Sequence, residues 1–148
     1  MRKLSDALKE LGVDFSFPIE IKDANGKGTY YEDSEGFWRK YEYDYNGKET
    51  YFENSNGYWE KYEYDTNGNQ TYFENSDDYW FKSEYDANGN KTYYEDSNDF
   101  WCKREYDANG KETYYEDRYG KKKGTPRSQS CDGKVIEVDG KKYKLTEL

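Results

Sequence analysis

YEYDTNGNQTYFENSDDYWFK, residues 62–82, places an aromatic side chain at seven of 21 positions and contains no Leu, Ile, Val or Met. The segment predicts two short β-strands separated by turns, because Tyr, Phe, Trp and Thr favour strands. Asn67-Gly68 suits the positive backbone angles of a type I′ hairpin turn, and the run NSDD predicts a second turn. Stacked aromatic rings are therefore expected to replace branched aliphatic side chains in this protein.

The segment is one unit of a repeat with a period of 21 residues. Trp recurs at 38, 59, 80 and 101, and Asn-Gly begins at 25, 46, 67, 88 and 109. Residues 24–117 thus hold four full units and most of a fifth. The predicted fold class is all-β: an antiparallel β-hairpin meander or solenoid of 21-residue repeats, with a short N-terminal helix and a C-terminal capping hairpin.

Alternation of side chains predicts two different faces. If the turn spans Asp33–Gly36, then Tyr31 faces Trp38, and these two slots, which hold Tyr or Phe and Trp in the later units, share one face. The slots of residues 39 and 41 vary between units and are expected to be solvated; they include Cys102, which is then incidental, and Ser83. The predicted aromatic core consists of Tyr31, Trp38, Phe52, Trp59, Phe73, Trp80, Tyr94 and Trp101.

Both ends differ from the repeats, because all eleven Leu, Ile and Val residues lie outside residues 24–117. Residues 1–23 are expected to form a helix and an extended lead-in, with Ser5 as the helix N-cap and Gly12 ending the helix. Residues 118–133 are expected to be a basic linker, and residues 134–148 a hairpin about Asp139-Gly140. Both termini are expected to cap the repeats; alternatively, one of them grips a partner.

Charge is distributed unevenly along the chain of 148 residues. The net charge is −9, yet residues 24–117 carry 23 carboxylates and 10 cations, while residues 118–148 carry 9 cations and 4 carboxylates. Direct binding of duplex DNA by the repeats is not expected. The mean hydropathy is −1.49, and we expect no membrane association. The first residues lack the apolar stretch of a signal peptide, so the expected location is the cytoplasm, that of a bacterial host cell if the gene is phage-borne.

The residues for catalysis and metal binding are scarce. The chain has no His and only two cysteines, Cys102 and Cys131, which cannot form a zinc site by themselves. The alternating Asp and Asn of DTNGN suggest calcium, but the glycine lies at position 4 instead of position 6 of an EF-hand loop. We therefore expect no enzyme activity, no metal and no cofactor.

A column of glutamates recurs through the repeats. The simplest interpretation is a cross-strand charge ladder with the recurring lysines, worth about 0.2–1 kcal/mol per pair. The functional interpretation is an acidic array that binds a partner. Its members are Glu32, Glu42, Glu53, Glu63, Glu74, Glu84, Glu95, Glu105 and Glu116.

The leading hypothesis is a non-enzymatic protein-binding module whose partner has a basic surface; a nucleic-acid-binding effector is one such partner. A specific version is an inhibitor from a phage or mobile element, of the anti-CRISPR or anti-defence type, that mimics DNA. One alternative is a carbohydrate-binding or cell-wall-binding module with Trp38, Trp59, Trp80 and Trp101 as stacking platforms. A second is a structural protein that forms homo-oligomers through its outer strands.

The motifs YEYDTNGNQT and EYDANGNKT resemble the YD repeats of RHS-type proteins. The matching positions are Tyr43-Asp44, Tyr64-Asp65, Tyr85-Asp86 and Tyr106-Asp107, each followed by a glycine. The resemblance covers residues 24–117 and implies a β-hairpin repeat fold. In that family the repeats build large shells around toxins, for which four to five units are far too few. MORN-like repeats are a weaker match.

Overall fold

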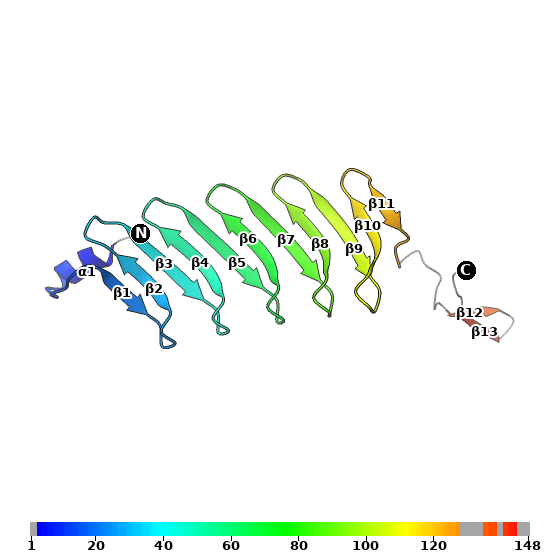
Figure 1. Cartoon of the computed structure of the whole chain (residues 1–148), viewed down its shortest axis with the longest axis horizontal. Helices are drawn as coiled ribbons and strands as arrows, with labels where there is room; N and C mark the ends of the chain where they lie inside the picture. The colour runs from blue at the N-terminus through cyan, green and yellow to red at the C-terminus, as the bar shows by residue number, and fades with distance from the viewer. Residues whose placement is uncertain (1–2, 128–134, 139–140, 145–148) are drawn as a thin grey trace. The chain divides into compact units, whose positions relative to one another are not determined.

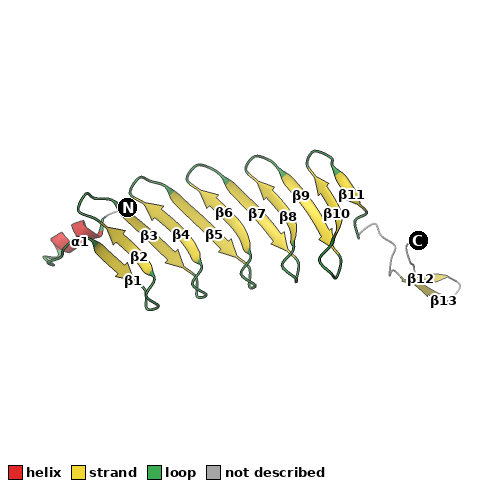
Figure 2. Cartoon of the chain, in the orientation of Figure 1, coloured by secondary structure: helices red, strands yellow, loops and turns green. Residues whose placement is uncertain are grey.

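The computed structural model describes residues 3–127, 135–138 and 141–144. A short helix is followed by an antiparallel sheet whose strand order follows the chain, which confirms the predicted all-β hairpin meander (Figures 1 and 2). The chain divides into two compact units, one ending at Lys82 and one beginning at Ser83. The elements are α1 (Leu4–Glu10), β1 (Ile19–Lys22), β2 (Gly28–Glu32), β3 (Trp38–Tyr43), β4 (Glu49–Asn54), β5 (Trp59–Tyr64), β6 (Gln70–Asn75), β7 (Trp80–Tyr85), β8 (Lys91–Asp96), β9 (Trp101–Tyr106), β10 (Glu112–Asp117), β11 (Lys122–Gly124), β12 (Val135–Val138) and β13 (Lys141–Lys144).

The Asn-Gly turns differ from the predicted type I′ geometry. In the turn after β3, Gly47 N donates to Asp44 O at 2.9 Å and Asp44 N donates to Lys48 O at 2.8 Å. The Asp44 side chain accepts from Asn46 N and Lys48 N, at 2.9 and 2.8 Å. Gly47 has a positive φ of 76° but Asn46 does not, so this is a type I turn closed by a left-handed glycine.

The second turn of each unit has the same geometry, which shifts the predicted register. Asp33 N donates to Phe37 O at 3.0 Å, so the turn includes one residue more than expected. Glu32 therefore pairs with Trp38, and Tyr31 pairs with Arg39. The predicted pairing of Tyr31 with Trp38 is wrong, and their side chains lie on opposite faces.

We call the two surfaces of the sheet the Trp face and the Phe face. In the first compact unit, which ends at Lys82, the Trp face carries Trp38, Trp59 and Trp80, and the Phe face carries Tyr31, Phe52 and Phe73. In the second compact unit Trp101 lies on the Trp face, and Tyr94 pairs with Cys102 on the Phe face. The predicted aromatic core is therefore not one cluster but two half-sets on opposite faces.

Aromatic rings on the Phe face pack mainly against their cross-strand neighbours. The ring centroids of Tyr41 and Phe52 lie 5.1 Å apart, those of Tyr62 and Phe73 5.3 Å, and those of Phe73 and Phe81 5.5 Å. These rings remain half-buried. Cross-strand aromatic pairs of this kind stabilise a sheet beyond the area that they bury.

Two residues in the variable slots of the Phe face are buried, contrary to the prediction, whereas Arg39 is exposed as expected. Cys102 is 1% exposed and Ser83 is 3% exposed. Each is a small side chain in a row of large ones, and Cys102 pairs with Tyr94 and Asp117 on its two sides. The larger neighbours therefore exclude water from these positions.

The sheet continues beyond the predicted repeat boundary at residue 117. β11 lies within the segment expected to be a linker, and it pairs with β10 through Glu116 and Lys122. Residues 128–133 of that segment are outside the described residues. β12 and β13 form the predicted hairpin as a separate two-stranded sheet, while its turn residues, Asp139 and Gly140, are also outside the described residues and its capping role stays a prediction.

α1 is the only helix of the described residues, and it is too short to cross a membrane. It ends as predicted at Gly12, whose φ is 67°. Gly12 N donates to Lys9 O at 3.1 Å and Val13 N to Leu8 O at 3.0 Å, which satisfies the last carbonyls of the helix.

Candidate functional site: the Trp face

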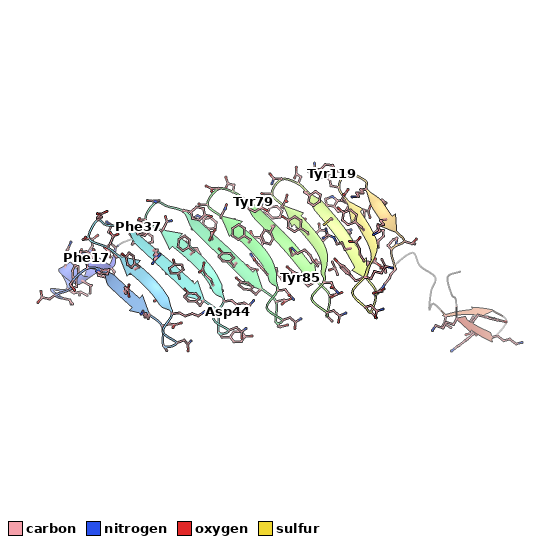
Figure 3. The ribbon with its side chains drawn as sticks, in the orientation of Figure 1. Phe17, Phe37, Asp44, Tyr79, Tyr85 and Tyr119 are labelled. Carbon is pink, nitrogen blue, oxygen red and sulfur yellow. The ribbon has the colours of Figure 1, made fainter. Side chains whose placement is uncertain are left out.

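The Trp face repeats one arrangement of side chains in each unit. The strand that begins with Trp presents Trp, Lys and Glu at alternate positions, as in Trp59, Lys61 and Glu63 of β5. The next strand presents Tyr and Glu, as in Tyr72 and Glu74 of β6. Glu63 pairs with Tyr72 and Lys61 with Glu74. The turns close the strands at both ends: in Figure 3, Phe37 and Tyr79 mark one end of the strands of the first unit and Asp44 the other.

In the strands that begin with Trp, the glutamates Glu42 and Glu63 point into solvent. The side chains of Glu42 and Glu63 are 52% and 57% exposed. Lys40 Nζ contacts Glu42, and Lys61 Nζ lies 3.3 Å from Glu63 Oε1. Exposed ion pairs of this kind contribute about 0–1 kcal/mol, so these carboxylates can exchange their lysines for a partner's cations at little cost.

The glutamates of the neighbouring strands accept hydrogen bonds from tyrosines two residues earlier. Tyr51 Oη donates to Glu53 at 3.3 Å and Tyr93 Oη donates to Glu95 at 2.9 Å. Burial, followed by the charge of Glu53, raises the pKa of Tyr51 above its usual value. The tyrosines therefore stay protonated at neutral pH and act as donors.

Glu32 is the exception in the predicted acidic array because α1 covers it. Glu32 is 1% exposed and accepts from Ser5 N at 3.0 Å, Ser5 Oγ at 2.5 Å and Tyr30 Oη at 2.9 Å. Leu4 N donates to Tyr30 Oη at 3.2 Å. Burial favours protonation of Glu32, but the hydrogen bonds from Ser5 and Tyr30 and the nearby charge of Lys3 outweigh it and lower its pKa.

Two predictions at the N-terminus are therefore corrected. Glu32 cannot contact a partner, because its carboxylate is already enclosed by the helix. Ser5 is not the N-cap, which is Lys3. Ser5 lies in the first turn, and its hydroxyl donates to Glu32 of β2. The remaining eight glutamates of the array lie on the Trp face of their units.

The basic segment after the repeats folds onto the Trp face of the second unit. Lys122 Nζ lies 2.8 Å from Glu116 Oε1, and Arg127 N donates to Glu105 Oε2 at 2.8 Å. The hydrogen bond from Lys122, together with that from Tyr114, lowers the pKa of Glu116. Two members of the acidic array thus already bind a basic chain segment, which here comes from the same protein.

Two indole faces are covered by lysines of their own strands. Lys82 Nζ lies 5.3 Å from the ring centroid of Trp80, and Lys103 Nζ lies 5.7 Å from that of Trp101. Trp38 is 6% exposed. A sugar ring that stacks on an indole needs the ring face that these lysines occupy, so the geometry does not favour the carbohydrate-binding alternative.

Open grooves lie on the Trp face of each unit. The groove of the first unit has a volume of about 530 Å³ and that of the second unit about 550 Å³. The first is lined by Lys40, Glu42, Thr50, Tyr51, Glu53, Lys61 and Tyr62. Among the described residues, no three His, Cys, Asp or Glu side chains are grouped so that they could hold a metal ion.

The tyrosines of the Trp face were not among the predicted site residues. They are Tyr30, Tyr51, Tyr72, Tyr93 and Tyr114, each two residues before a glutamate of the array. The signal was present in the sequence as the recurring pattern Thr-Tyr-aromatic-Glu. By itself the pattern predicts only a strand. The hydrogen bond from the tyrosine hydroxyl to the glutamate two residues later is evident only in the structure.

No protein-family model matches the chain, and no curated protein matches it. Solved structures with a similar fold include the crystal structure of TcdB2-TccC3-TEV, with 13% identity and a TM-score of 0.50 over 80% of this chain and 6% of that chain. The crystal structure of TcdB2-TccC3-Cdc42 shows 16% identity and a TM-score of 0.49 over 67% of this chain and 5% of that one. A structure of the Photorhabdus luminescens Tc holotoxin pore with a mutation in TccC3 shows 16% identity and a TM-score of 0.48, over 68% and 5% of the two chains. The chain thus spans about a twentieth of the length of these proteins, and the likeness shows the fold alone, a YD-repeat-like β-hairpin fold.

Proposed function

We propose that the chain is a non-enzymatic protein-binding module that engages basic segments of a partner through its Trp face. The observation that carries this proposal is that the chain binds a basic segment of its own. Glu105 and Glu116 bind the chain's own segment around Lys122 and Arg127, while the equivalent Glu42 and Glu53 of the first unit line an open groove. Residues 24–117 have a net charge of −13, which would attract a cationic partner over several ångströms and speed association.

The specific form of the proposal concerns the partner. A nucleic-acid-binding effector offers the regularly spaced lysines and arginines that such an array needs. The chain would then act as an inhibitor in the cytoplasm of a bacterial cell, of the anti-defence or anti-CRISPR type carried by phages, by occupying a surface otherwise bound by DNA or RNA. Acidity and the carboxylates gathered on one face support this form.

The experiment compares two triple variants with equal net charge. In the test variant the outward glutamates Glu42, Glu63 and Glu84 become glutamine. In the control variant three exposed carboxylates off the array, Glu20, Glu35 and Asp77, become the corresponding amides. The wild type and both variants are immobilised as full chains and exposed to bacterial lysate with and without nuclease, and bound proteins are identified by mass spectrometry.

The wild type and the control are expected to retain the same basic proteins, and the test variant to lose them. Retention should fall as salt rises from about 0.05 to 0.5 M, because screening weakens contacts between exposed charges. The proposal would be contradicted if retention of the bound proteins did not fall with rising salt, or if it were equal for the test variant and the wild type. Retention only in the absence of nuclease would mean that nucleic acid, and not a protein surface, forms the bridge.

Assembly through the sheet edges is the second candidate. In the described sheet, β1 and β11 each have a neighbour on one side only, and open strand edges can pair with another chain. β11 carries Lys122 and Lys123, which oppose such pairing. Light scattering across a range of concentrations distinguishes this candidate, since it predicts a mass that rises with concentration.

A further inference from the structure

α1 is held on the Trp face by its first peptide groups. The first N–H groups of any helix lack partners within the helix, and together they form its positive end. Here Leu4 N donates to Tyr30 Oη at 3.2 Å and Ser5 N to Glu32 Oε2 at 3.0 Å. Ser5 Oγ adds a bond of 2.5 Å to the same carboxylate. A tyrosine and a glutamate of one strand thus form a receptor for the start of a helix.

The same receptor recurs at intervals of 21 residues. Tyr51 donates to Glu53 as Tyr30 does to Glu32, and Tyr72 bonds to Glu74 in the next unit. Above Tyr51 and Glu53 lies the open groove of about 530 Å³, at the place that corresponds to the one α1 fills in the preceding repeat. The chain therefore carries one occupied Tyr–Glu pair and further copies of that pair, in which Lys40 lies opposite Glu53 where Ile19 lies opposite Glu32.

We propose that the Tyr51–Glu53 and Tyr72–Glu74 pairs bind the N-terminal turn of a helix in a partner protein, with a serine at the position of Ser5. This inference rests on the proposed protein-binding function and specifies which structural element of the partner is bound. The partner's first amide groups donate to the glutamate and the tyrosine hydroxyl, and its serine hydroxyl donates to the same carboxylate.

The residues that flank each receptor define what else the partner helix must carry. In the first repeat, Leu4 and Ala7 line an apolar cavity with Ile21 and Tyr30. Ile21 pairs with Tyr30, and one repeat later Glu42 pairs with Tyr51 at the equivalent position. A helix in the later grooves meets a carboxylate where α1 meets isoleucine. It therefore needs a lysine or arginine in place of Leu4, directly before its serine.

The test uses a synthetic peptide of residues 3–12, KLSDALKELG, with the substitution Leu4→Lys. The peptide is titrated into the isotope-labelled full chain and followed by NMR. We expect saturable chemical-shift changes at Tyr51, Glu53, Tyr72 and Glu74. The Kd should be about 1 mM, because the free peptide is too short to be helical in water. The unsubstituted peptide should bind at least about fivefold more weakly, since its Leu4 would desolvate Glu42 without pairing it.

Two further comparisons test the receptor itself. A peptide that also carries Ser5→Ala should bind about tenfold more weakly, the loss of one hydrogen bond to a charged group. On the chain, Glu53→Gln with Glu74→Gln should abolish binding. The matched control is Glu49→Gln with Glu60→Gln, because Glu60 also accepts from tyrosines, at 2.7 and 2.5 Å, but lies on the Phe face; this control should bind normally.

The inference is overturned if no saturable shifts occur up to about 5 mM peptide, if Ser5→Ala leaves the affinity unchanged, or if the Phe-face control loses binding as completely as the test variant. Circular dichroism confirms that both chain variants keep their strands. Failure here is distinguishable from failure of the proposed function: if Glu53→Gln with Glu74→Gln still retains the wild-type set of basic proteins from lysate, the protein-binding module stands and helix docking is wrong.

Discussion

Substituting Glu32 with glutamine should release α1 from the sheet at a cost of about 3 kcal/mol. The carboxylate is buried and accepts three hydrogen bonds, from Ser5 N, Ser5 Oγ and Tyr30 Oη. Bonds to a buried charged group contribute about 1.5–3 kcal/mol each. Glutamine keeps one oxygen as acceptor, but its amide nitrogen is a donor and would face donors of Ser5 or Tyr30. At least one strong bond is lost, and one buried donor is left without a partner.

The assay combines urea unfolding with hydrogen exchange of the Leu4 and Ser5 amides. Both amides should exchange at nearly the rate of an unfolded chain in Glu32→Gln. The matched control is Glu74→Gln, which alters the equivalent position of a later unit where the carboxylate is half-buried and no helix is docked; its cost should stay below about 1 kcal/mol. In a double-mutant cycle, Glu32 and Ser5 should show a coupling of about 1–3 kcal/mol.

The same coupling should depend on pH in a defined direction. The folded-state pKa of Glu32 is lowered, so its contribution to stability is present above the unfolded-state pKa of about 4.3 and is lost as the pH falls through the folded-state value. The difference between wild type and Glu32→Gln should therefore shrink in acid. Equal costs for Glu32→Gln and Glu74→Gln at neutral pH, or a cost for Glu32→Gln that does not change with pH, would refute this account of α1 docking.

Four other predictions concern the turns, the Phe face and the tyrosines. Gly57→Ala should cost about 1–2 kcal/mol of stability in urea unfolding, because its φ is 82° and the added Cβ meets nothing within 4 Å, so the penalty is that of the backbone alone. Asp78→Gly, where an aspartate has a φ of 60° in the equivalent turn, should instead stabilise by about 0.5 kcal/mol; no gain would contradict the shared turn geometry. Ser83→Ala should raise the free energy of unfolding by about 1 kcal/mol, since the buried hydroxyl has no partner among the described residues. Burial raises the pKa of Tyr30 to about 12 and that of Tyr62 further still, so the folded state keeps protons that the unfolded state loses and stability should fall as the pH rises above about 10. Tyrosinate absorbance and circular dichroism should change together, and tyrosinate formation without loss of strands would be the contrary result.

Most of the fold could be predicted from the repeat because its signals are local. The period of 21 residues, the two strands per unit and the helix ending at Gly12 all depend on residues close in sequence. The predicted turn type is wrong because Asn46-Gly47 alone favours a type I′ turn, whereas the Asp44 side chain accepts from two amides and so favours the longer turn. Since side chains alternate along a strand, one additional turn residue moved Tyr31 to the other face.

The site could be predicted only in part for a related reason. The recurrence of the glutamates follows from periodicity, but their placement on one face does not. In the predicted register Glu42 shares the face of Trp38 and Glu53 lies on the opposite face, and the longer turn brings both onto the Trp face. The burial of Glu32 depends on Ser5, which is 27 residues away in the sequence. No local sequence pattern predicts a contact between residues so far apart in the chain. Neither does any local pattern show that Arg127 returns to Glu105. Both contacts arise from segments outside the repeat.

The turns have a consequence for how such a gene can change over time. Each 21-residue repeat closes its Asn-Gly turn with its own aspartate and glycine, so the hydrogen bonds at Asp44, Asp65 and Asp86 are the same. Unequal recombination between these equivalent turns would insert or remove a whole hairpin pair without changing the hydrogen bonds of the remaining turns. The number of acidic repeats can therefore change by whole 21-residue steps during evolution, while the first repeat, which holds α1, stays the same.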